Sequence, residues 1–306
     1  MANKKFMIIG AHSSIIILWA SAFPGIRAGL ESYSPENLAL FRLLIGSAAL
    51  GVLALLTKMR LPDIKDLPPI LILGFLGFTV YHIALNIGEK TVSSGPASLI
   101  VSMTPIFSAA LAAIFLRERF GRVRWIGSAV SFAGAVLISL GTGGGFEIQT
   151  GILFVLLASV SESIYFVFQA KYFNKYGFLS FTSYTVWAGT SFMLIYLPGL
   201  GSEIFHATAE STFSVLYLGI FPTVIPYIAL AFLASIRGTS EAVSSLYLTP
   251  AIAFVIAWVW LGEVPAMLSI AGGVITLAGV MIIHRKESSV KVTETYENGP
   301  GENIKK

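Results

Sequence analysis

The stretch TPIFSAALAAIFLRE, Thr104–Glu118, recurs 145 residues later as TPAIAFVIAWVWLGE, Thr249–Glu263. Both copies begin with Thr-Pro, end with Glu and are almost entirely apolar in between. The same shift places Gly127 on Gly272 and Gly134 on Gly279. Identical apolar letters are common by chance in such sequences, but a Thr-Pro pair, a Glu and two Gly in one register are not. The pattern predicts an internal repeat that spans the chain.

The composition around these stretches is typical of a protein whose solvent is lipid. Of 306 residues, 55% are hydrophobic and 12% are charged, and the mean hydropathy is +0.80. Soluble domains carry roughly 25% charged residues. The absence of cysteine excludes disulfides, thiolate metal sites and cysteine nucleophiles. The net charge of +4 is attributed to loop charges and does not indicate a nucleic-acid partner.

Ten apolar segments follow one another with short connections. A β-barrel would show alternating segments of about ten residues, so helices remain as the structure that satisfies the backbone in hydrocarbon. The first segment is too long for a secretory signal and is predicted to be retained. We expect an all-α integral membrane protein with ten transmembrane helices near residues 6–30, 35–56, 68–88, 93–116, 122–140, 150–172, 180–198, 212–234, 239–261 and 266–284.

The distribution of basic residues gives the orientation, because positively charged loops stay in the cytoplasm. With the N-terminus inside, every Lys and Arg except Arg27, Arg42 and Lys90 falls on the cytoplasmic side. The chain is therefore expected to be a multi-pass protein of the cytoplasmic membrane with both termini inside. The polar tail, 285–306, is predicted to be a disordered cytoplasmic extension.

Each half of the chain contains five predicted spans. Because five is odd, the second half enters the bilayer from the opposite side, so the two repeats, 6–140 and 150–284, are predicted to be inverted. The stretch 141–145, Gly-Thr-Gly-Gly-Gly, has the composition of a linker between them. Inverted repeats are typical of secondary transporters, which bind substrate near the midplane and alternate access between the two sides.

Several motifs resemble one transporter family. Trp19-Ala-Ser-Ala-Phe23, Phe41-Arg42, and Pro105 followed by Leu116-Arg117-Glu118 resemble the EamA family of the drug/metabolite transporter superfamily, and the second half repeats the last signature as Thr249-Pro250 and Leu261-Gly262-Glu263. The resemblance covers residues 6–284. It implies a ten-helix transporter of a small metabolite, often an exporter. Where the second copy in that family often carries Trp in its first helix, this sequence has Glu162, so the resemblance does not transfer a substrate.

Glu162 is the strongest candidate for a functional side chain. It falls near the middle of the sixth span, where an ionised group facing lipid would cost several kcal/mol. At helical spacing Ser159, Glu162 and Gln169 share one face with Phe166. Glu162 either binds a substrate amine or a coupling proton, or it is a protonated side chain that bonds to a neighbouring helix.

A second polar stripe lies in the third span, where Thr79, His82 and Asn86 share one helical face. His82 either relays protons or binds substrate, or it is a neutral bridge between helices. Arg42 either attracts an anionic group of the substrate or extends to the interface and pairs with Glu31 or Glu36. Glu118 and Glu263, at corresponding span ends, are interpreted as structural.

Prolines and aromatic residues complete the candidate site. Pro105 and Pro250 fall near the middles of the fourth and ninth spans, where proline frees a carbonyl and kinks the helix, so they are predicted to act as hinges; Pro24, Pro222 and Pro226 interrupt two other spans. Small residues at four-residue spacing in spans five and ten, Gly127, Ser131, Gly272 and Thr276, are predicted to pack helices. The predicted aromatic lining of the cavity consists of Trp19, Phe23, Tyr81, Tyr227 and Tyr247, with Tyr165 as a further candidate.

Two other functions fit the sequence less well than a transporter. A membrane-embedded enzyme loses its usual residues, since the only two Asp lie in one loop and neither HExxH nor a phosphate-binding GxxxxGK occurs. A channel would need a ring of repeated charges, which is absent from the sequence. We therefore predict no catalytic residues, no metal and no cofactor. The expected partners are a small-molecule substrate, the lipid bilayer, and a proton or exchanged solute, in a monomer or a homodimer.

Overall fold

The computed structural model describes residues 2–115, 122–141, 150–237, 242–243, 246, 248–264, 266–279 and 281–282. Within these ranges the chain is helical and contains no strand, so the predicted all-helical class is confirmed. Several predicted features lie outside the described residues: Glu118, the Gly-rich linker after Gly141, Tyr247 and the tail. The α-helices are α1 (Ala2–Leu30), α2 (Pro35–Leu56), α3 (Leu67–Gly74), α4 (Tyr81–Glu89), α5 (Ser94–Val101), α6 (Thr104–Phe115), α7 (Arg122–Gly141), α8 (Thr150–Gln169), α9 (Phe173–Tyr176), α10 (Phe178–Met193), α11 (Leu197–His206), α12 (Ala209–Arg237) and α14 (Thr249–Leu261).

Six helical runs in the described part of the chain are long and apolar enough to cross a membrane: Lys5–Leu30, Pro35–Leu56, Ile64–Glu89, Ser94–Leu111, Thr150–Tyr176 and Ala209–Ile236. Four other helices occupy the remaining expected segments. These are α7, α10 and the two shorter apolar helices, α14 and Met267–Gly279. The chain is thus a multi-pass membrane protein.

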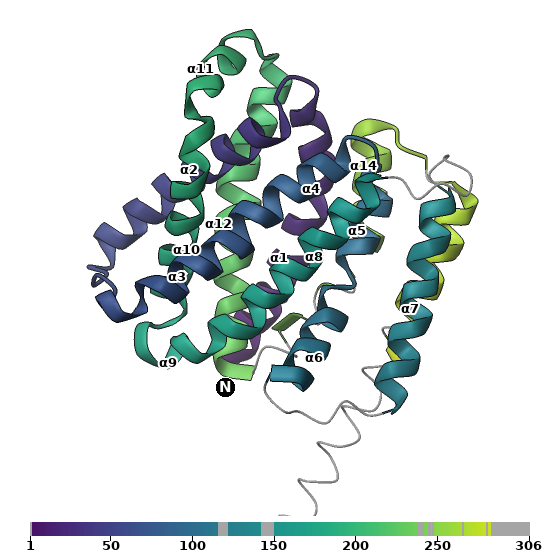
Figure 1. Cartoon of the computed structure of the whole chain (residues 1–306), viewed down its shortest axis with the longest axis horizontal. Helices are drawn as coiled ribbons and strands as arrows, with labels where there is room; N and C mark the ends of the chain where they lie inside the picture. Colours follow the sequence, from purple (N-terminus) through teal and green to yellow (C-terminus); the bar gives the residue numbers. More distant parts are fainter. Residues whose placement is uncertain are drawn as a thin grey trace, which may run out of the picture.

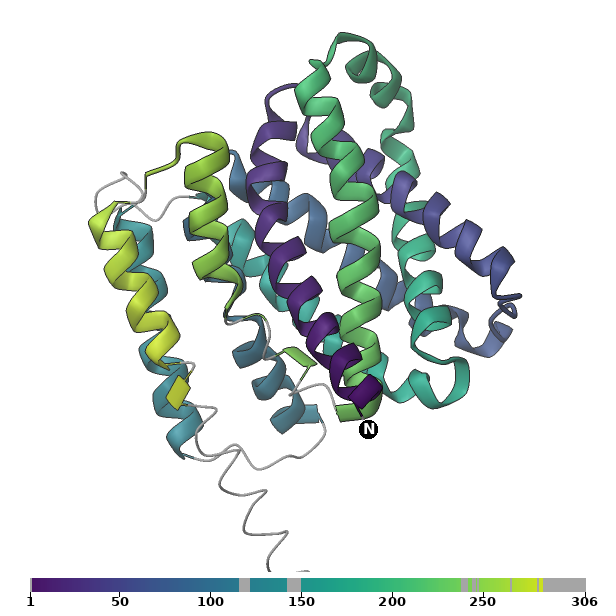
Figure 2. The ribbon, with the colours of Figure 1, turned by 180° about the vertical axis from the view of Figure 1, so that it is seen from behind.

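The helices form a bundle in which the two halves of the sequence intermix (Figure 1). From behind, α1 lies along α12, with α14 on its other side, so elements from both halves surround α1 (Figure 2). On the opposite face α4 packs on α8, and α2 packs on α12 and α10. The helix Met267–Gly279 runs beside α7 at one edge of the bundle (Figures 1 and 2).

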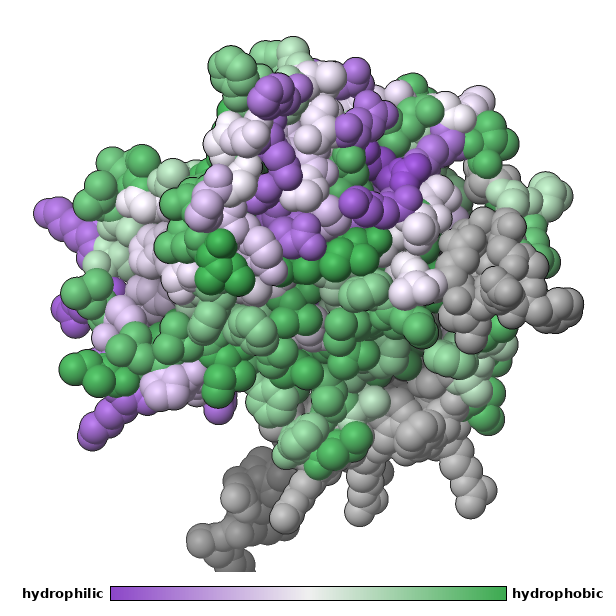
Figure 3. Space-filling view, turned by 45° about the horizontal axis from the view of Figure 1, so that its top comes forward, coloured by the Kyte–Doolittle hydropathy of each residue, from purple (hydrophilic) through white to green (hydrophobic). Residues whose placement is uncertain are grey.

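The surface of the bundle reverses the pattern of a soluble protein, and its mainly apolar core also contains polar and charged groups. Hydrophilic residues gather at the end of the molecule that carries α11, and the surface below it is mainly hydrophobic (Figure 3). Large apolar side chains such as Phe6, Leu55 and Trp258 are exposed. The buried polar set, in contrast, includes Arg42, His82, Asn86, Glu89 and Glu162. An interior that holds so many polar groups in a lipid-facing bundle marks an internal site or pathway.

The fourth and ninth spans are broken rather than kinked at their prolines. Helix α5 ends at Val101, and a turn at Ser102 and Met103 precedes α6, in which Pro105 is the second residue. Pro250 is likewise the second residue of α14. Proline fits the first turn of a helix because its missing N–H would have no partner there. The expectation of a mid-helix kink is therefore wrong for both residues, although the two breaks do occupy corresponding positions.

Span three contains a π-helical turn, Phe75–Val80, between α3 and α4. A π turn takes more residues than an α turn, so it changes which side chains share a face. Thr79 donates to Gly189 O of α10 at 2.9 Å, whereas Asn86 donates to Pro35 O of α2 at 2.8 Å. Thr79 and Asn86 of the predicted polar stripe therefore bond to different neighbouring helices.

Helices α7 and Met267–Gly279 make a reciprocal contact. Ser131 Oγ donates to Thr276 O at 3.0 Å, and Thr276 Oγ1 approaches Ser131 O at 3.4 Å. A Cβ at Gly134 would lie 2.5 Å from Gly272 O, and one at Gly279 would lie 2.5 Å from Gly127 O. The predicted role of these small residues in close helix packing is confirmed. The contact relates residues by the same 145-residue shift as the repeat.

Candidate functional site

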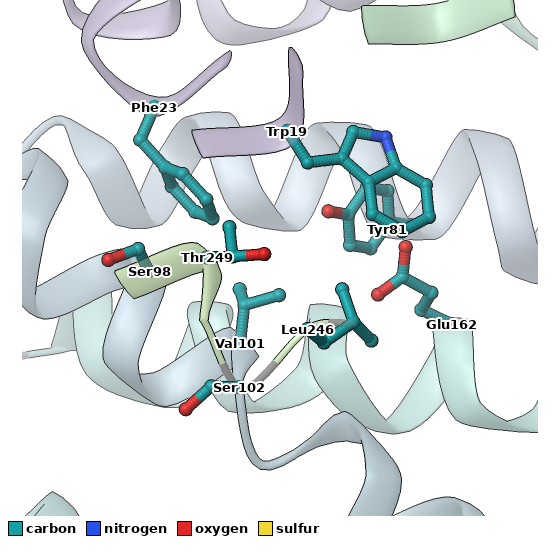
Figure 4. Close-up of a pocket in the computed structure, with 9 residues that line it drawn as sticks. All are labelled: Trp19, Phe23, Tyr81, Ser98, Val101, Ser102, Glu162, Leu246 and Thr249. Carbon is teal, nitrogen blue, oxygen red and sulfur yellow. The ribbon is translucent and has the colours of Figure 1, made fainter. Parts of the chain in front are cut away.

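A small central cavity lies among α1, α4, α5, α8 and the start of α14 (Figure 4). Its volume of about 10 Å³ leaves space for about one water molecule, so this structure is closed around it. Predicted residues Trp19, Phe23, Tyr81 and Glu162 do line this cavity. The remaining lining residues are Ser98, Val101, Ser102, Leu246 and Thr249.

Glu162 is 2% exposed, and its carboxyl group points toward the rings of Trp19 and Tyr81 (Figure 4). Thr104 Oγ1 donates to Glu162 Oε2 at 3.4 Å, and Tyr227 OH donates to Oε1 at 3.4 Å. Both bonds are long, and no ion pair of Glu162 occurs among the described residues. A buried carboxyl held this weakly is suited to accept a cationic group or a proton.

Aromatic rings form the wall opposite α5. Trp19 lies 5.1 Å from Tyr227 in an edge-on arrangement and 6.2 Å from Phe166 in a stacked one. Tyr227 does not line the cavity, but it reaches the site through its bond to Glu162. Tyr165 packs edge-on against Phe78, with ring centres 5.2 Å apart, behind this wall. Aromatic faces beside a carboxyl favour an organic cation.

Prolines in α12 explain why Trp19 is fixed. Pro226 has no N–H for the carbonyl of Pro222, four residues earlier, and Trp19 Nε1 donates to that oxygen at 3.1 Å. Pro222 likewise leaves Leu218 O free, and Thr223 Oγ1 donates to it at 2.8 Å. The predicted freeing of carbonyls is thus confirmed for α12.

Helix α8 supports the break between α5 and α6. Ser159 Oγ donates to Val155 O at 3.0 Å and lies 3.4 Å from Ile100 O, beside the break. Ser163 Oγ donates to Thr104 O at 2.9 Å. Ser159 is therefore placed one helical turn from Glu162 as a support for the broken helix, and it does not line the cavity.

Thr249 was not predicted as a site residue. Its hydroxyl is buried and lacks a hydrogen-bond partner among the described residues. It lines the cavity at the first residue of α14, where free backbone N–H groups favour an anion. The Thr-Pro repeat was the available signal, but sequence reasoning assigned it to a hinge and overlooked the hydroxyl.

The comparisons with known proteins give the family of the chain. The model of the EamA-like transporter family matches residues 6–140 and 149–285. The chain belongs to the EamA-like transporter family. It is 58% identical over 286 residues to the uncharacterized transporter YdfC of Bacillus subtilis (strain 168), covering 94% of each chain. The protein is therefore a membrane transporter and not an enzyme.

A second relative is named for its cargo. The probable terminal-alkyne amino-acid exporter of Streptantibioticus cattleyicolor is 39% identical over 271 residues, covering 89% of this chain and 91% of the relative. A crystal structure of a protein with 18% sequence identity has a similar fold, with a TM-score of 0.65 over 92% of this chain and 97% of that chain.

The remaining predicted site residues of this EamA transporter lie away from the cavity lining. His82 Nδ1 donates to Phe78 O of its own helical run at 2.8 Å, and Asn86 ties α4 to α2. Gln169 is buried at the end of α8, and neither side-chain polar atom has a partner among the described residues. The structure therefore brings Trp19, Phe23, Tyr81, Tyr227 and Glu162 together, but not His82, Asn86 or Gln169.

Arg42 is inside the transporter rather than at the membrane interface. It is 2% exposed, and its Nε donates to Thr223 Oγ1 at 2.6 Å. Its Nη1 has no partner among the described residues. The expectation that Arg42 extends to the interface and pairs with Glu31 or Glu36 is wrong, because α2 turns this side toward α12.

Charged contacts connect α1, α4, α5 and α14 at the end of the transporter opposite the N-terminus. Glu263 accepts from Ser94 N at 3.0 Å and from Ser94 Oγ at 3.2 Å, and its Oε1 lies 3.5 Å from Arg27 Nε. Arg27 Nη1 also donates to Glu89 O at 2.5 Å. Glu263 thereby joins α14 to the first turn of α5, so its predicted structural role is confirmed.

A second charged contact lies at the end that carries the N-terminus. Lys175, near the end of α9, lies 2.6 Å from Asp63 Oδ2 and 2.5 Å from Asp66 Oδ2. Tyr176 OH also donates to Asp66. Each end of the bundle therefore has charged contacts between the first and second halves of the chain. The described residues contain no cluster of three or more potential metal ligands.

Proposed function

We propose that this transporter exports a small metabolite of the amino-acid class across the cytoplasmic membrane, with the central cavity as its binding site. The observation that carries the proposal is Glu162, a weakly bonded carboxyl buried in a closed cavity beside aromatic rings. The name of the Streptantibioticus relative supports both the amino-acid class and the direction of transport.

The cavity offers complementary partners for the two charged groups of an amino acid. Glu162 receives the ammonium group, with Trp19 and Tyr81 contributing their ring faces. Thr249 Oγ1 and the N-terminus of α14 receive the carboxylate, as discontinuous helices do in other transporters. Val101, Leu246 and Phe23 border the space for the side chain. Because the cavity holds about one water as it stands, substrate entry requires the surrounding helices to separate.

Alternating access is proposed to use ten spans arranged as two inverted five-helix repeats, with both termini in the cytoplasm. The 145-residue register of the Ser131 and Thr276 contact supports the repeat. The breaks before Pro105 and Pro250 supply matching hinges in the two halves. Opening toward the cytoplasm breaks the Lys175 contacts with Asp63 and Asp66, and opening outward breaks the Arg27 contact with Glu263. A proton or an exchanged solute drives the cycle.

Counterflow in proteoliposomes tests the function. Vesicles that contain the full chain are loaded with an unlabelled amino acid, and uptake of the same labelled compound is followed. The panel consists of the proteinogenic L-amino acids and one terminal-alkyne amino acid, after a thermal-shift screen for binding. Saturable counterflow of at least one compound is expected. Flux that rises linearly with concentration would indicate a channel, and no flux of any compound would reject the amino-acid class.

Glu162→Gln tests the site itself. The substitution keeps the size of the side chain but removes the negative charge, so we expect binding and counterflow to be lost. One hydroxyl, of Thr104 or Tyr227, then accepts from the new amide group instead of donating. Glu162→Asp retains a charge and should retain part of the activity. The matched control is Glu203→Gln in α11, whose carboxyl accepts from Ser34 N at 2.9 Å outside the cavity. Wild-type rates and pH dependence in Glu162→Gln would reject this site.

A further inference from the structure

A second acid, Glu89, is buried more completely than Glu162. It is the last residue of α4 and is 0% exposed. Neither of its carboxyl oxygens has a hydrogen-bond partner among the described residues. An ionised carboxyl in such surroundings is expensive unless a charge or a proton compensates it. Sequence reasoning missed this residue because it lies at the end of an apolar segment, where an acid is normally exposed.

Charged groups from three segments of the chain interact with Glu89. Arg27 of α1, Arg42 of α2 and Glu263 after α14 all interact with it electrostatically. Arg27 directs its hydrogen bond to the backbone oxygen of Glu89, and its ion pair is with Glu263. The interior cation without a carboxyl partner is therefore Arg42, within the part of the chain that the structure describes.

Arg42 interacts electrostatically with both Glu89 and Glu162. One guanidinium cannot neutralise two buried carboxylates. The interior is therefore electrically neutral only when one of the two acids also holds a proton or a cationic substrate. The Arg42 guanidinium therefore links the binding of a cation at Glu162 to the binding of a proton at Glu89, because it can neutralise only one of the two carboxylates at a time.

Along α4, a row of polar atoms without hydrogen-bond partners among the described residues leads from the height of the central cavity to Glu89. His82, Asn86 and Glu89 lie at i, i+4 and i+7 of α4, so they share one face. His82 Nε2, Asn86 Oδ1 and both Glu89 oxygens have no hydrogen-bond partner in the described part of the chain. The row extends about 10 Å along the helix. Buried polar atoms of this kind are usually satisfied by internal water, which also conducts protons.

The far end of this row reaches the outer surface. Lys90, the next residue, lines a cavity of about 280 Å³ together with Arg27, Leu30, Glu31, Leu261 and Glu263. Arg27 also holds the backbone of Glu89 at this boundary. Glu89 is thus placed between the interior charges and external water.

We propose that Glu89 is the proton-binding site that couples export to the proton gradient, with Arg42 as the link to Glu162. A proton from outside binds the Glu89 carboxylate, Arg42 turns to Glu162, and the ammonium group of the substrate is released outward. Loss of that proton toward the cytoplasm returns Arg42 to Glu89 and leaves Glu162 free for the next substrate. One proton enters for each cationic group that leaves. The transport part of this cycle rests on the proposed function.

Infrared difference spectroscopy of the full chain in lipid nanodiscs tests the site without any substrate. Spectra are compared over a range from about pH 5 to about pH 9. We expect the carbonyl stretch of a protonated carboxyl to titrate, to be lost in Glu89→Gln, to remain in Glu89→Asp, and to change its midpoint in Glu162→Gln. Glu31→Gln, an exposed acid of the outer cavity, is the matched control and should match the wild type. Identical spectra for Glu89→Gln and the wild type would overturn the proposal.

Transport assays distinguish the coupling of export to the proton gradient from the binding of substrate. Using the amino acid found by counterflow, we expect Glu89→Gln to exchange substrate with a raised KM and no pH dependence, and to lose accumulation driven by a pH gradient. Full accumulation in this variant would overturn the coupling role. If the wild type exchanges no amino acid, the proposed function fails while the infrared result still decides the role of Glu89.

Discussion

Two serines and one threonine line the central cavity, and their hydroxyl groups differ in the hydrogen bonds that they make. Ser98 Oγ donates to Gly95 O and Ser102 Oγ donates to Leu99 O, both at 2.6 Å within α5. The Thr249 hydroxyl has no such partner among the described residues. A buried hydroxyl without a partner costs free energy that a bound ligand recovers. At the scale of single residues, Thr249 is therefore the polar group best placed to recognise substrate.

Thr249→Val tests this assignment, because valine keeps the shape and removes the hydroxyl. A hydrogen bond to a charged group contributes about 1.5–3 kcal/mol, so affinity for the transported amino acid should fall by about tenfold to 100-fold. Binding is measured by the substrate-dependent thermal shift of the purified protein. Thr249→Ser should bind normally, and Ser98→Ala, which loses a bond within its own helix, should change affinity much less. Unchanged affinity in Thr249→Val would contradict the role.

At the scale of helices, proline leaves backbone carbonyl groups without their usual donor, and side chains then bond to these carbonyls. In α12, Pro226 leaves Pro222 O for Trp19, and Pro222 leaves Leu218 O for Thr223, which in turn accepts from Arg42. One pair of prolines therefore fixes a wall of the cavity and positions the interior cation. In spans four and nine, proline begins a new helix instead, because a turn precedes it.

Pro226→Ala should compensate for the loss of the Trp19 indole N–H. Trp19→Phe leaves Pro222 O unpaired, which should destabilise the protein by about 1–3 kcal/mol, while alanine at 226 supplies the missing backbone donor. The temperature at which half the detergent-solubilised protein leaves its monodisperse peak is measured for the single and double variants. Trp187→Phe is the control, because Trp187 Nε1 donates at 3.1 Å to Ser47 O, which no proline has freed. If Pro226→Ala helps both Trp variants equally, the explanation is incorrect.

At the scale of the whole molecule, the repeat has a local structural counterpart. In the contact between α7 and Met267–Gly279, Ser131 meets Thr276, the residue 145 positions later that corresponds to it in the second repeat. Each of the two side chains approaches the backbone oxygen of the other residue. A reciprocal contact of this kind is the property of a two-fold axis. It supports the proposal that the two halves are related by such an axis in the membrane plane.

Gly134→Ala and Gly279→Ala test this relation. A Cβ would lie 2.3 Å from Thr276 Oγ1 in the first variant and 2.4 Å from Ser131 Oγ in the second. The helices must separate in either case, so we expect both variants to lower the thermal midpoint by similar amounts. Gly51→Ala, with no atom within 4 Å of the new Cβ, should be neutral or stabilising. A large effect in only one of the two variants would contradict the symmetric contact.

The sequence by itself determined the helical membrane class, the 145-residue register of the repeat, the family resemblance and the choice of Glu162 as a candidate site residue. These properties follow from composition, spacing and the cost of a charge in hydrocarbon, all of which are local or additive. The tertiary structure decided what Arg42, Thr249 and Glu89 face. It also converted the expected kinks at Pro105 and Pro250 into breaks, because each proline stands in the first turn of a new helix. A helical wheel gives the direction of a side chain within its own helix but not which helix packs there, so partners such as Arg42 and Thr223 become visible only when α2 and α12 are in contact.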